Sequence, residues 1–481
     1  MVAASTAIPE MGVAELSAAI AARRVSCAET MAATLDAIER LNPGVNAIVG
    51  LRARAGLLAE AAERDAALAR GDRLGPLHGI PLAVKDLDAV RGLPFTQGSP
   101  IFRDRIAEAD TIQVERLRAS GAILIGKTNT PEFGLGSHTF NPVYGATRNA
   151  YDPARTAGGS SGGAAVAVAL RMLPVADGSD HAGSLRNPPA FNNLYGLRTR
   201  PGRIPIEGRD VFTPGLAVSG GIGRSPADLG LLLSVQAGPD PRVPLSLPED
   251  PGVFAGELDA DVSGLRIAWL GDLGGHLPFE PGVLDLAAGA LPAFAALGVR
   301  VEHACPAFDY EALWRDWLVL RAWTTAAALR PLYDAPAHRR LLKPEAVWEV
   351  ERGLALTADA VTAALEGRSA WYGALRRFME PFAALAMPSA QVFPFALEAR
   401  WPAQVGGRAM DTYHRWMETV IPVTMSGLPA LNVPAGFDAR GRPTGVQIVA
   451  RGELDCLRLG AAYDGATGWV RRRRPPALDA A

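Results

Sequence analysis

The sequence predicts an α/β fold with a substantial central sheet. Helical periodicity alternates along the chain with short apolar runs of strand length, which is typical of this class. Hydrophobic residues make up 48% and charged residues 20% of the chain, so the material for a large core is present. At 481 residues the length allows about three average domains, but α/β enzymes often exceed that average as one unit. We therefore expect a single domain over residues 1–481.

Local patterns assign the elements in chain order. A segment of Gly and Ser cannot pack as a strand or helix, so residues 158–163 (GGSSGG) must form a loop. The other predicted elements of the first half are two amphipathic helices in 11–42, a strand over 79–84 that ends at Lys85, a helix over 112–119, a strand over 121–126, a helix over 164–172, a strand over 173–176 and a second small-residue loop over 177–184.

The second half of the chain is rich in tryptophan. Seven of the nine tryptophans lie between Trp314 and Trp416, among predicted helices over 311–333 and 345–380. We interpret 306–416 as a helical elaboration beside the functional site, although ordinary core packing would also explain each aromatic residue. Short strands return at 428–436 and 445–450 within a final core segment, 417–470. The run Arg471 to Arg474 is predicted to be a solvated tail.

Charge and cysteine content exclude several classes of function. Lys plus Arg (48) nearly balances Asp plus Glu (50), and the net charge of -2 gives no electrostatic basis for nucleic-acid binding. Cys27, Cys305 and Cys456 are widely separated, as in a reduced protein, and no His or Cys cluster has the spacing of metal ligands. No apolar run is long enough to span a membrane, and the N-terminus lacks signal-peptide features. We expect a cytoplasmic protein without metal, cofactor, nucleic-acid or membrane partner.

Two motif matches do not fit their physical requirements. Residues 121–128 match the P-loop expression GxxxxGK[ST], but the variable positions are Ala, Ile, Leu and Ile, which belong in a strand rather than a phosphate-binding loop. Residues 158–162 match the GxSxG nucleophile elbow, but the preceding polar segment, which contains Pro153, cannot supply the strand that such an elbow follows. Neither match is expected to be functional.

A Ser-His-Asp triad is also a poor interpretation of Asp180, His181 and Ser184. Residues so close in sequence are not expected to place an imidazole between serine and carboxylate. What remains is Lys85 at the end of a strand and two serines flanked by glycines, Ser160 and Ser184. A serine nucleophile needs a base, and a lysine made neutral by burial can serve. A surface Lys85 paired with Asp86 is the alternative.

Three segments together resemble the amidase signature family. They are residues 79–86, with Lys85 in a Gly-x-Pro-x-x-Val-Lys-Asp pattern; 158–163, the GGSSGG loop; and 178–184, ending at Ser184. Ser160 and Ser184 are 24 positions apart (184 − 160), the interval usual in that family. Residues 126–133, 185–188 and 427–436 extend the likeness over nearly the whole chain. The resemblance implies a mixed, twisted central sheet covered by helices on both faces, with the core signature over about 75–220.

The resemblance also implies roles for individual residues. Ser184 is the nucleophile, Ser160 relays its proton after a cis peptide bond, and Lys85 is the base. The main-chain N–H groups of the nucleophile loop are expected to hold the oxyanion: His181, Ala182, Gly183 and Ser184. The residues expected to support the site are Ser161, Asp180 and Arg186. His181 is expected to lie in the loop as part of the pocket wall.

The substrate is expected to be a small amide, carbamate or ester that reacts with water. Where the family has Gly-Gly before the nucleophile this chain has Ala182 and Gly183, and Ala tolerates positive φ poorly. The aromatic density favours a hydrophobic, roomy pocket like that of members acting on aryl amides, nylon oligomers and urethanes. Alternatives are the glutaminase subunit of a tRNA-dependent amidotransferase and a catalytically silent member; a monomer or homodimer is expected. Candidate pocket residues are Gly136, Ser137, His138, Trp314 and Trp317.

Overall fold

An eight-stranded mixed sheet forms the centre of the protein. The computed structural model describes residues 8–208, 210–213 and 215–479. The strand order is β10-β9-β11-β15-β14-β7-β8-β6; β10, β9 and β11 run parallel and every other neighbouring pair is antiparallel. The α/β prediction is therefore confirmed. The strands are β6 Val175–Asp180, β7 Tyr195–Arg198, β8 Val218–Gly223, β9 Arg266–Trp269, β10 Arg300–His303, β11 Ala384–Pro388, β14 Ala430–Phe437 and β15 Pro443–Ala450.

A second, three-stranded sheet stands beside the first. It has the order β1-β3-β2, where β2 (Pro81–Lys85) runs parallel to β3 (Ile123–Thr128) and β1 (Ile48–Val49) is antiparallel to β3. Every residue of β2 and β3 is buried, which explains why their sequences are continuous apolar runs rather than alternating ones. Lys127 and Thr128 lie within β3, so the segment that matches a P-loop is a strand. Both predicted strands are present, but in this smaller sheet.

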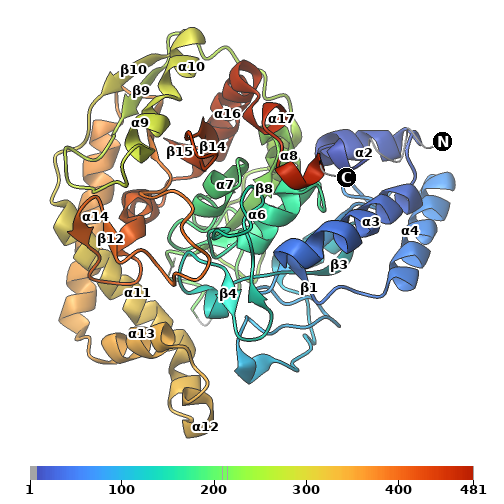
Figure 1. Cartoon of the computed structure of the whole chain (residues 1–481), viewed down its shortest axis with the longest axis horizontal. Helices are drawn as coiled ribbons and strands as arrows, with labels where there is room; N and C mark the ends of the chain where they lie inside the picture. Colours follow the sequence, from blue (N-terminus) through green and yellow to red (C-terminus); the bar gives the residue numbers. More distant parts are fainter. Residues whose placement is uncertain (1–7, 209, 214, 480–481) are drawn as a thin grey trace.

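Helices cover the sheets and extend the molecule at both ends. In Figure 1 the helices α2 (Val13–Ala21), α3 (Cys27–Val45) and α4 (Arg54–Ala69) lie at one end of the long axis, and four helices between residues 310 and 378 lie on the opposite side and at the bottom of the view. The latter are α11 Tyr310–Tyr333, α12 Pro336–Arg339, α13 Pro344–Leu354 and α14 Ala358–Phe378. The remaining helices are α5 Ile112–Ala119, α6 Gly162–Ala169, α7 Asn187–Phe191, α8 Pro226–Gln236, α9 Val283–Ala288, α10 Leu291–Ala296, α15 Ile421–Ser426, α16 Glu453–Thr467 and α17 Trp469–Arg472.

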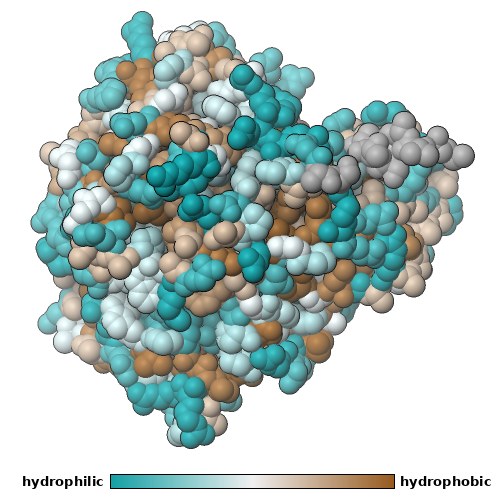
Figure 2. Space-filling model, viewed as in Figure 1, coloured by the Kyte–Doolittle hydropathy of each residue, from teal (hydrophilic) through white to brown (hydrophobic). Residues whose placement is uncertain are grey.

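Short elements complete the chain. Two small hairpins pair β4 (Phe140–Asn141) with β5 (Gly145–Ala146), and β12 (Gln404–Val405) with β13 (Arg408–Ala409). The 3-10 helices are η1 Ile8–Glu10, η2 Pro100–Phe102, η3 Glu132–Gly134, η4 Pro251–Ala255, η5 Arg415–Val420 and η6 Pro476–Leu478. Hydrophilic and hydrophobic residues are interspersed on the face shown in Figure 2. Within the described ranges, no helix has both the length and the apolar content needed to cross a bilayer.

Several sequence-based boundaries differ from the structure. The helix predicted over 345–380 is two helices, because Thr357 caps a new one by accepting the N–H of Ala360 at 3.1 Å. The helix predicted over 164–172 is Gly162–Ala169, so the last two residues of the predicted loop 158–163 are helical. The strand predicted over 173–176 continues to Asp180, into the predicted loop 177–184. The last difference arises because glycine occurs within these paired strands. β6 pairs with the glycine-rich strand β8, which approaches β7 so closely that a Cβ on Gly220 would stand 2.1 Å from the carbonyl oxygen of Leu197.

Candidate active site

Three side chains predicted from the sequence lie in one hydrogen-bonded line. Lys85 Nζ is 2.8 Å from Ser160 Oγ, and Ser160 Oγ is 2.9 Å from Ser184 Oγ. Each comes from a different local structure: Lys85 is the last residue of β2, Ser160 follows a cis peptide bond after Gly159, and Ser184 follows β6. Lys85 is fully buried, whereas Ser160 and Ser184 are 3% and 8% exposed. The end of the line at Ser184 is therefore the part nearest to solvent.

The amine of Lys85 is buried among hydroxyl groups. Its Nζ is also 2.8 Å from Ser161 Oγ and 3.1 Å from Ser179 Oγ. Burial lowers the pKa of Lys85 from 10.5 to about 8, although Asp177 and Asp88 favour the charged form. The alternative of a surface lysine paired with Asp86 is wrong, because Asp86 instead accepts from Thr96 and lies 3.9 Å from Lys127. Lys85 can thus be neutral at pH values near those at which most enzymes work.

Asp177 and Ser179 belong to the site but are not singled out by the sequence. The main-chain N–H of Lys85 donates to Asp177 Oδ1 at 3.1 Å, and Ser179 contacts the amine with both its hydroxyl and its carbonyl oxygen. Burial raises the pKa of Asp177 to about 7, and Asp88 adds to this rise. Asp177 and Ser179 are two positions apart in the sequence. Because 177–180 belongs to strand β6, this spacing places both side chains on the same face of the strand.

A buried ion network anchors the loop that carries Ser184. The carboxylate of Asp180 accepts the N–H of Gly183 at 2.8 Å and that of Leu185 at 3.0 Å. It also pairs with the guanidinium groups of Arg186 at 2.9 Å and Arg198 at 3.0 Å, and all three ionic side chains are fully buried. Burial would raise the pKa of Asp180, but the two arginines more than offset this and hold it below its usual range. The ionised carboxylate therefore holds the loop in shape.

The nucleophile loop accommodates alanine at one position and needs glycine at the next. Gly183 has φ of 97°, and a Cβ there would stand 2.3 Å from Asn187 Oδ1. Ala182 is not among the residues with positive φ, and its side chain is buried at 4% exposure. The concern that alanine strains the loop is thus answered, because the left-handed conformation falls on Gly183 alone.

Most residues predicted to line the pocket serve the framework. His138 is 3% exposed and both ring nitrogens are bonded: Nε2 donates to the carbonyl of Leu397 at 2.9 Å and Nδ1 accepts from Thr156 at 2.7 Å. Ser137 donates to the carbonyl of Gly159 at 2.7 Å and so holds the residue before Ser160. Gly136 has φ of 91° and faces the ring of Tyr413. The main chain at Gly134 also borders Ser160, since a Cβ on Gly134 would lie 3.6 Å from its hydroxyl.

Behind the nucleophile loop stands an aromatic wall. His181 lies edge-on to Trp317, with ring centroids 6.4 Å apart, and Trp317 packs on Trp314 at 4.8 Å. The two tryptophans are 0% and 1% exposed, so they form a packed wall rather than the lining of an open cavity. Burial lowers the pKa of His181 to about 3, with a further contribution from Arg321, so the imidazole is neutral. It forms no bridge between Asp180 and Ser184, whose hydrogen bonds go elsewhere.

An apolar cavity opens beside this wall. It encloses about 300 Å³, and Leu216 and Leu320 of its lining belong to the same packed cluster as Ala182 and Trp317. Trp323, on the helix α11 that also carries Trp314 and Trp317, is the tryptophan that lines it. Among the described residues, the lining is Asp210, Thr213, Gly215, Leu216, Leu320, Trp323, Thr324, Ala327, Ala328, Leu365 and Arg368.

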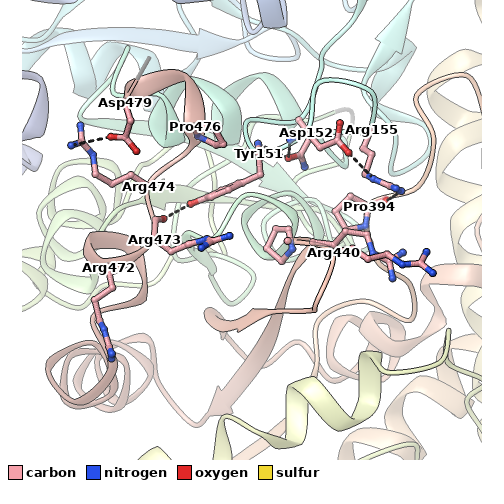
Figure 3. Close-up of a pocket in the computed structure, with 14 residues that line it drawn as sticks. Tyr151, Asp152, Arg155, Pro394, Arg440, Arg472, Arg473, Arg474, Pro476 and Asp479 are labelled. Carbon is pink, nitrogen blue, oxygen red and sulfur yellow. Dashed lines mark hydrogen bonds and ion pairs between the residues drawn. The ribbon is translucent and has the colours of Figure 1, made fainter. Parts of the chain in front are cut away.

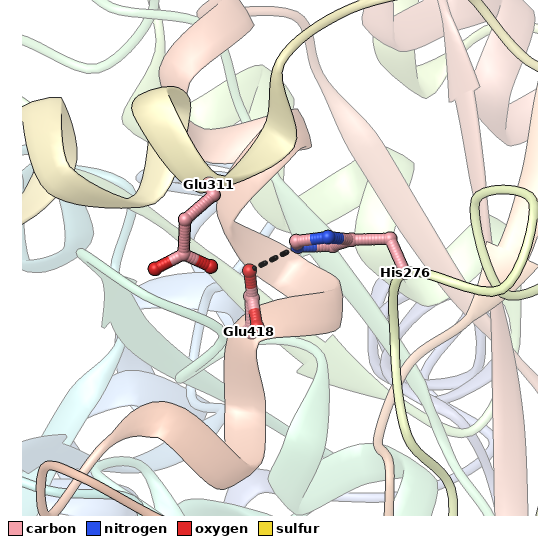
Figure 4. Close-up of side chains that lie close together, drawn as sticks. All are labelled: His276, Glu311 and Glu418. Atoms are coloured by element: carbon pink, nitrogen blue, oxygen red, sulfur yellow. Dashed lines mark hydrogen bonds and ion pairs between the residues drawn. The ribbon is translucent and has the colours of Figure 1, made fainter.

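One further cluster has the composition of a metal site. His276, Glu311 and Glu418 bring potential ligand atoms within 4.8 Å of one another, and His276 Nε2 is 2.8 Å from Glu418 Oε1 (Figure 4). However, Arg415 pairs with both carboxylates, at 2.5 Å from Glu311 and 2.9 Å from Glu418, and Arg408 lies 3.6 Å from Glu311. The carboxylates are already neutralised by arginine, which leaves little attraction for a metal cation.

Comparison with known proteins gives a consistent result. A family model described as Amidase matches residues 29–457. An acylamidase of Rhodococcus erythropolis is 36% identical, over 96% of this chain and 97% of that protein. A glutamyl-tRNA(Gln) amidotransferase subunit from Acidothermus cellulolyticus is 35% identical, over 94% and 93%. A bacterial aryl acylamidase of the amidase signature enzymes has a TM-score of 0.88 and 29% identity, with 95% and 96% of the two chains covered. A 6-aminohexanoate cyclic dimer hydrolase has a TM-score of 0.84 and 27% identity, with 97% and 99% covered.

Proposed function

Since this chain belongs to the amidase signature family and is an amide-hydrolysing enzyme, we propose that it acts through an acyl-enzyme formed on Ser184. The observation that carries the proposal is the line of short contacts from Lys85 through Ser160 to Ser184. A serine hydroxyl becomes a nucleophile when a base removes its proton, and Lys85 is the nearest base in this line. No metal or cofactor has a role in the proposed reaction.

The proposed cycle has two halves. In the first, Ser184 Oγ bonds to the amide carbonyl carbon as its proton passes to Ser160, whose own proton passes to neutral Lys85. The C–N bond then breaks, and the proton held by Lys85 returns through Ser160 to the departing amine. In the second half water attacks the ester carbonyl on Ser184 while the same relay takes a proton from the water. The bond between the carbonyl carbon and Ser184 Oγ then breaks, the relay returns the proton to Ser184 Oγ, and the carboxylic acid leaves. The relay works in both directions because Lys85 has a pKa near the working pH.

Main-chain N–H groups of the nucleophile loop are the proposed oxyanion donors. Among the described residues the N–H groups of His181, Ala182 and Ser184 have no acceptor, whereas that of Gly183 donates to Asp180. We therefore propose that the N–H groups of His181, Ala182 and Ser184 bind the oxyanion, whereas Gly183 shapes the turn. Loss of one such donor typically lowers turnover on the order of 100- to 1000-fold.

The proposed substrates are amides with a hydrophobic or aromatic group. The apolar cavity beside the aromatic wall supports this class. Trp323 and Leu320 line it, and Leu320 belongs to the same packed cluster as Ala182. The likeness to an acylamidase and to a bacterial aryl acylamidase supports it as well. Carbamates and esters present the same carbonyl to Ser184 and are included in the proposal.

A glutaminase component of an amidotransferase is the second candidate, favoured by the likeness to glutamyl-tRNA(Gln) amidotransferase subunits. His181, Ala182 and Asn187 depart from the Asp-Thr-Gly-Gly-Ser-Ile-Arg-Gln motif typical of that role. The neutral, half-buried His181 beside Trp317 also offers no charged partner for the glutamine side chain and its α-amino acid groups. Turnover of glutamine above that of aryl amides would favour this second candidate.

The decisive experiment is hydrolysis of a substrate panel by matched variants. The panel comprises benzoyl and acetyl p-nitroanilides, a p-nitrophenyl ester, an aryl carbamate and glutamine. The enzymes are wild type, Ser184→Ala, Ser160→Ala, Lys85→Ala and, as a control, Ser234→Ala, whose hydroxyl bonds only within its own helix. We expect turnover of the benzoyl anilide to be abolished in the first three variants and retained in the control. Turnover that survives Ser184→Ala would refute the mechanism, and equal turnover of all five substrates would refute the substrate class.

A further inference from the structure

A second cavity, whose lining includes none of the three proposed catalytic side chains, is rich in arginine. It encloses about 620 Å³ between the loop after residue 149, the turn between β14 and β15 and the segment that follows α17 (Figure 3). Its lining contains six arginines and two aspartates, a surplus of four positive charges (6 − 2), while the whole chain carries -2. These residues are Arg155, Arg440, Arg442, Arg472, Arg473, Arg474, Asp152 and Asp479.

Three of the six arginines are neutralised within the protein. Arg155 pairs with Asp152 at 2.9 Å. Arg442 pairs with Asp438 and with Glu280, both at 2.8 Å. Arg474 lies 2.7 Å from Glu10 and 3.4 Å from Asp479. These pairs account for both aspartates of the lining.

The other three, Arg440, Arg472 and Arg473, make no ion pair with any carboxylate in the described part of the chain. All three are exposed, but the side chain of Arg472 points away from the other labelled residues (Figure 3), which leaves Arg440 and Arg473 as the unpaired charges beside the cavity. Figure 3 shows Arg440 reaching from the β14–β15 side and Arg473 from the C-terminal side. The cavity thus combines unbalanced positive charges from two separate segments.

These arginines stand on a fixed framework. The carbonyl of Arg473 accepts from Tyr151 Oη at 2.7 Å and from Asn193 Nδ2 at 3.2 Å, and its guanidinium lies 5.3 Å from the centroid of the Phe437 ring. Arg472 donates to the carbonyl of Thr467 at 3.1 Å. The side chains of 471–474 are exposed, as predicted, but the segment is not a free tail: Arg471 and Arg472 belong to α17, and the backbone that follows is anchored.

We propose that this cavity binds a small phosphate-bearing anion with two or more negative charges. Guanidinium groups offer paired N–H donors that match the oxygens of phosphate, and arginine keeps its charge at every physiological pH. A volume of about 620 Å³ accommodates a molecule of metabolite size. Proline at 394, 443 and 476 stiffens three sides of the lining and so limits the ordering that binding requires. None of the lining residues touches Lys85, Ser160 or Ser184, so the site stands independently of the proposed mechanism.

The test uses pyrophosphate as the probe and the full chain as the receptor. Isothermal titration is performed at constant ionic strength set with sodium chloride, on wild type, on the double variant Arg440→Gln/Arg473→Gln, and on Arg340→Gln. Arg340 is a matched control because it is exposed, lies outside the lining and forms no ion pair with a described residue. Succinate, a dianion without phosphate, is titrated in parallel.

We expect saturable binding of one pyrophosphate per chain and a Kd raised about tenfold or more in the double variant. The Kd should be unchanged in Arg340→Gln, and succinate should bind more weakly than pyrophosphate. Hydrolysis of the benzoyl anilide by the double variant should equal that of wild type, which shows that it is folded. Absence of saturable binding, or equal binding by the double variant, would overturn the proposal. Succinate binding as tight as that of pyrophosphate would overturn the assignment to phosphate.

Discussion

The main-chain N–H of Lys85 donates to the carboxylate of Asp177 across 3.1 Å, and this bond joins the two sheets of the protein. Lys85 ends β2 of the three-stranded sheet, and Asp177 lies in β6 at the edge of the eight-stranded sheet. The same carboxylate favours the charged form of the lysine amine, although burial dominates and lowers its pKa. Asp177 therefore both places the base and adjusts its proton affinity.

Amide hydrolysis should rise with pH through about 8. Lys85 acts as a base only when neutral, and burial lowers its pKa to about 8, so the active form dominates above that pH and is lost below it. Well below this midpoint, kcat/KM should fall about tenfold for each pH unit. The measurement is kcat/KM for a p-nitroanilide between pH 5.5 and 9.5. A profile that is flat, or that falls as pH rises through 8, would contradict the assignment of Lys85.

The substitution Asp177→Asn should move this rise to lower pH. The side-chain oxygen of asparagine can still accept the N–H of Lys85, but the negative charge that favours the ammonium form is gone. Neutral Lys85 should then be present at lower pH than in wild type. Recording the same pH profile for Asp177→Asn tests this, and Asp359→Asn, in the exposed first turn of α14, serves as control. An unchanged midpoint would show that Asp177 acts on structure alone.

Loss of the Asp180 carboxylate should destabilise the protein strongly. In Asp180→Asn the buried guanidinium groups of Arg186 and Arg198 lose their counter-charge, which typically costs about 3–5 kcal/mol. The exposed pair of Arg330 and Asp334 provides the control, and Asp334→Asn should change stability by less than about 1 kcal/mol. Urea unfolding followed by tryptophan fluorescence measures both. Similar midpoints for the two variants would contradict the anchoring role of Asp180.

The two small residues before Ser184 should respond differently to substitution. Gly183→Ala places a Cβ 2.3 Å from Asn187 Oδ1 at a φ of 97°, so the loop must shift and turnover should fall about 100-fold or more. Ala182→Gly leaves the conformation allowed and removes one methyl group, so turnover should stay within about tenfold. Single-turnover acylation rates of the two variants make the comparison. If Ala182→Gly were the more damaging change, the assignment of the strained position would be wrong.

Truncation of Trp323 should alter substrate preference. Trp323→Ala removes the largest side chain from the lining of the apolar cavity, so kcat/KM for a benzoyl anilide should fall about tenfold or more. The value for an acetyl anilide should change much less, because an acetyl group has no aromatic ring to place against Trp323. Tyr372→Ala, an exposed aromatic residue on α14 outside the lining, is the control. Equal losses on both anilides would place the acyl group elsewhere.

Local patterns were sufficient for the class of fold and for three side chains, Lys85, Ser160 and Ser184, that the structure brings into one hydrogen-bonded line. Buried strands such as β2 and β3 have continuous apolar sequences, and Gly-rich loops have no side chains to pack, so both are visible in a short window. The partners of a strand are set by residues far along the chain, and for this reason β2 and β3 could not be placed in a separate sheet. The extension of β6 through Gly178 was not predicted, because glycine has a low strand propensity and this part of the strand depends on its pairing with β8.

The pocket was the least predictable part of the site. Trp314, Trp317 and Trp323 all lie on α11, and sequence spacing does not reveal which turn of the helix meets a cavity. Two of them pack on His414, and only the third reaches open space. Ser179 was missed for a related reason, since its contact with Lys85 depends on how β6 packs against β2.

The division of the catalytic line between two sheets makes turnover sensitive to their alignment. Lys85 belongs to one hydrogen-bonded layer and Ser184 follows a strand of the other, and the contacts between them, 2.8 and 2.9 Å, tolerate only a few tenths of an ångström of lengthening. A shift of β2 along β6 would lengthen these contacts and interrupt the proposed proton transfer, while the hydrogen bonds within each sheet stayed intact. In the proposed mechanism, the residues where β2 meets β6 therefore influence turnover by keeping Lys85 aligned with Ser160 and Ser184.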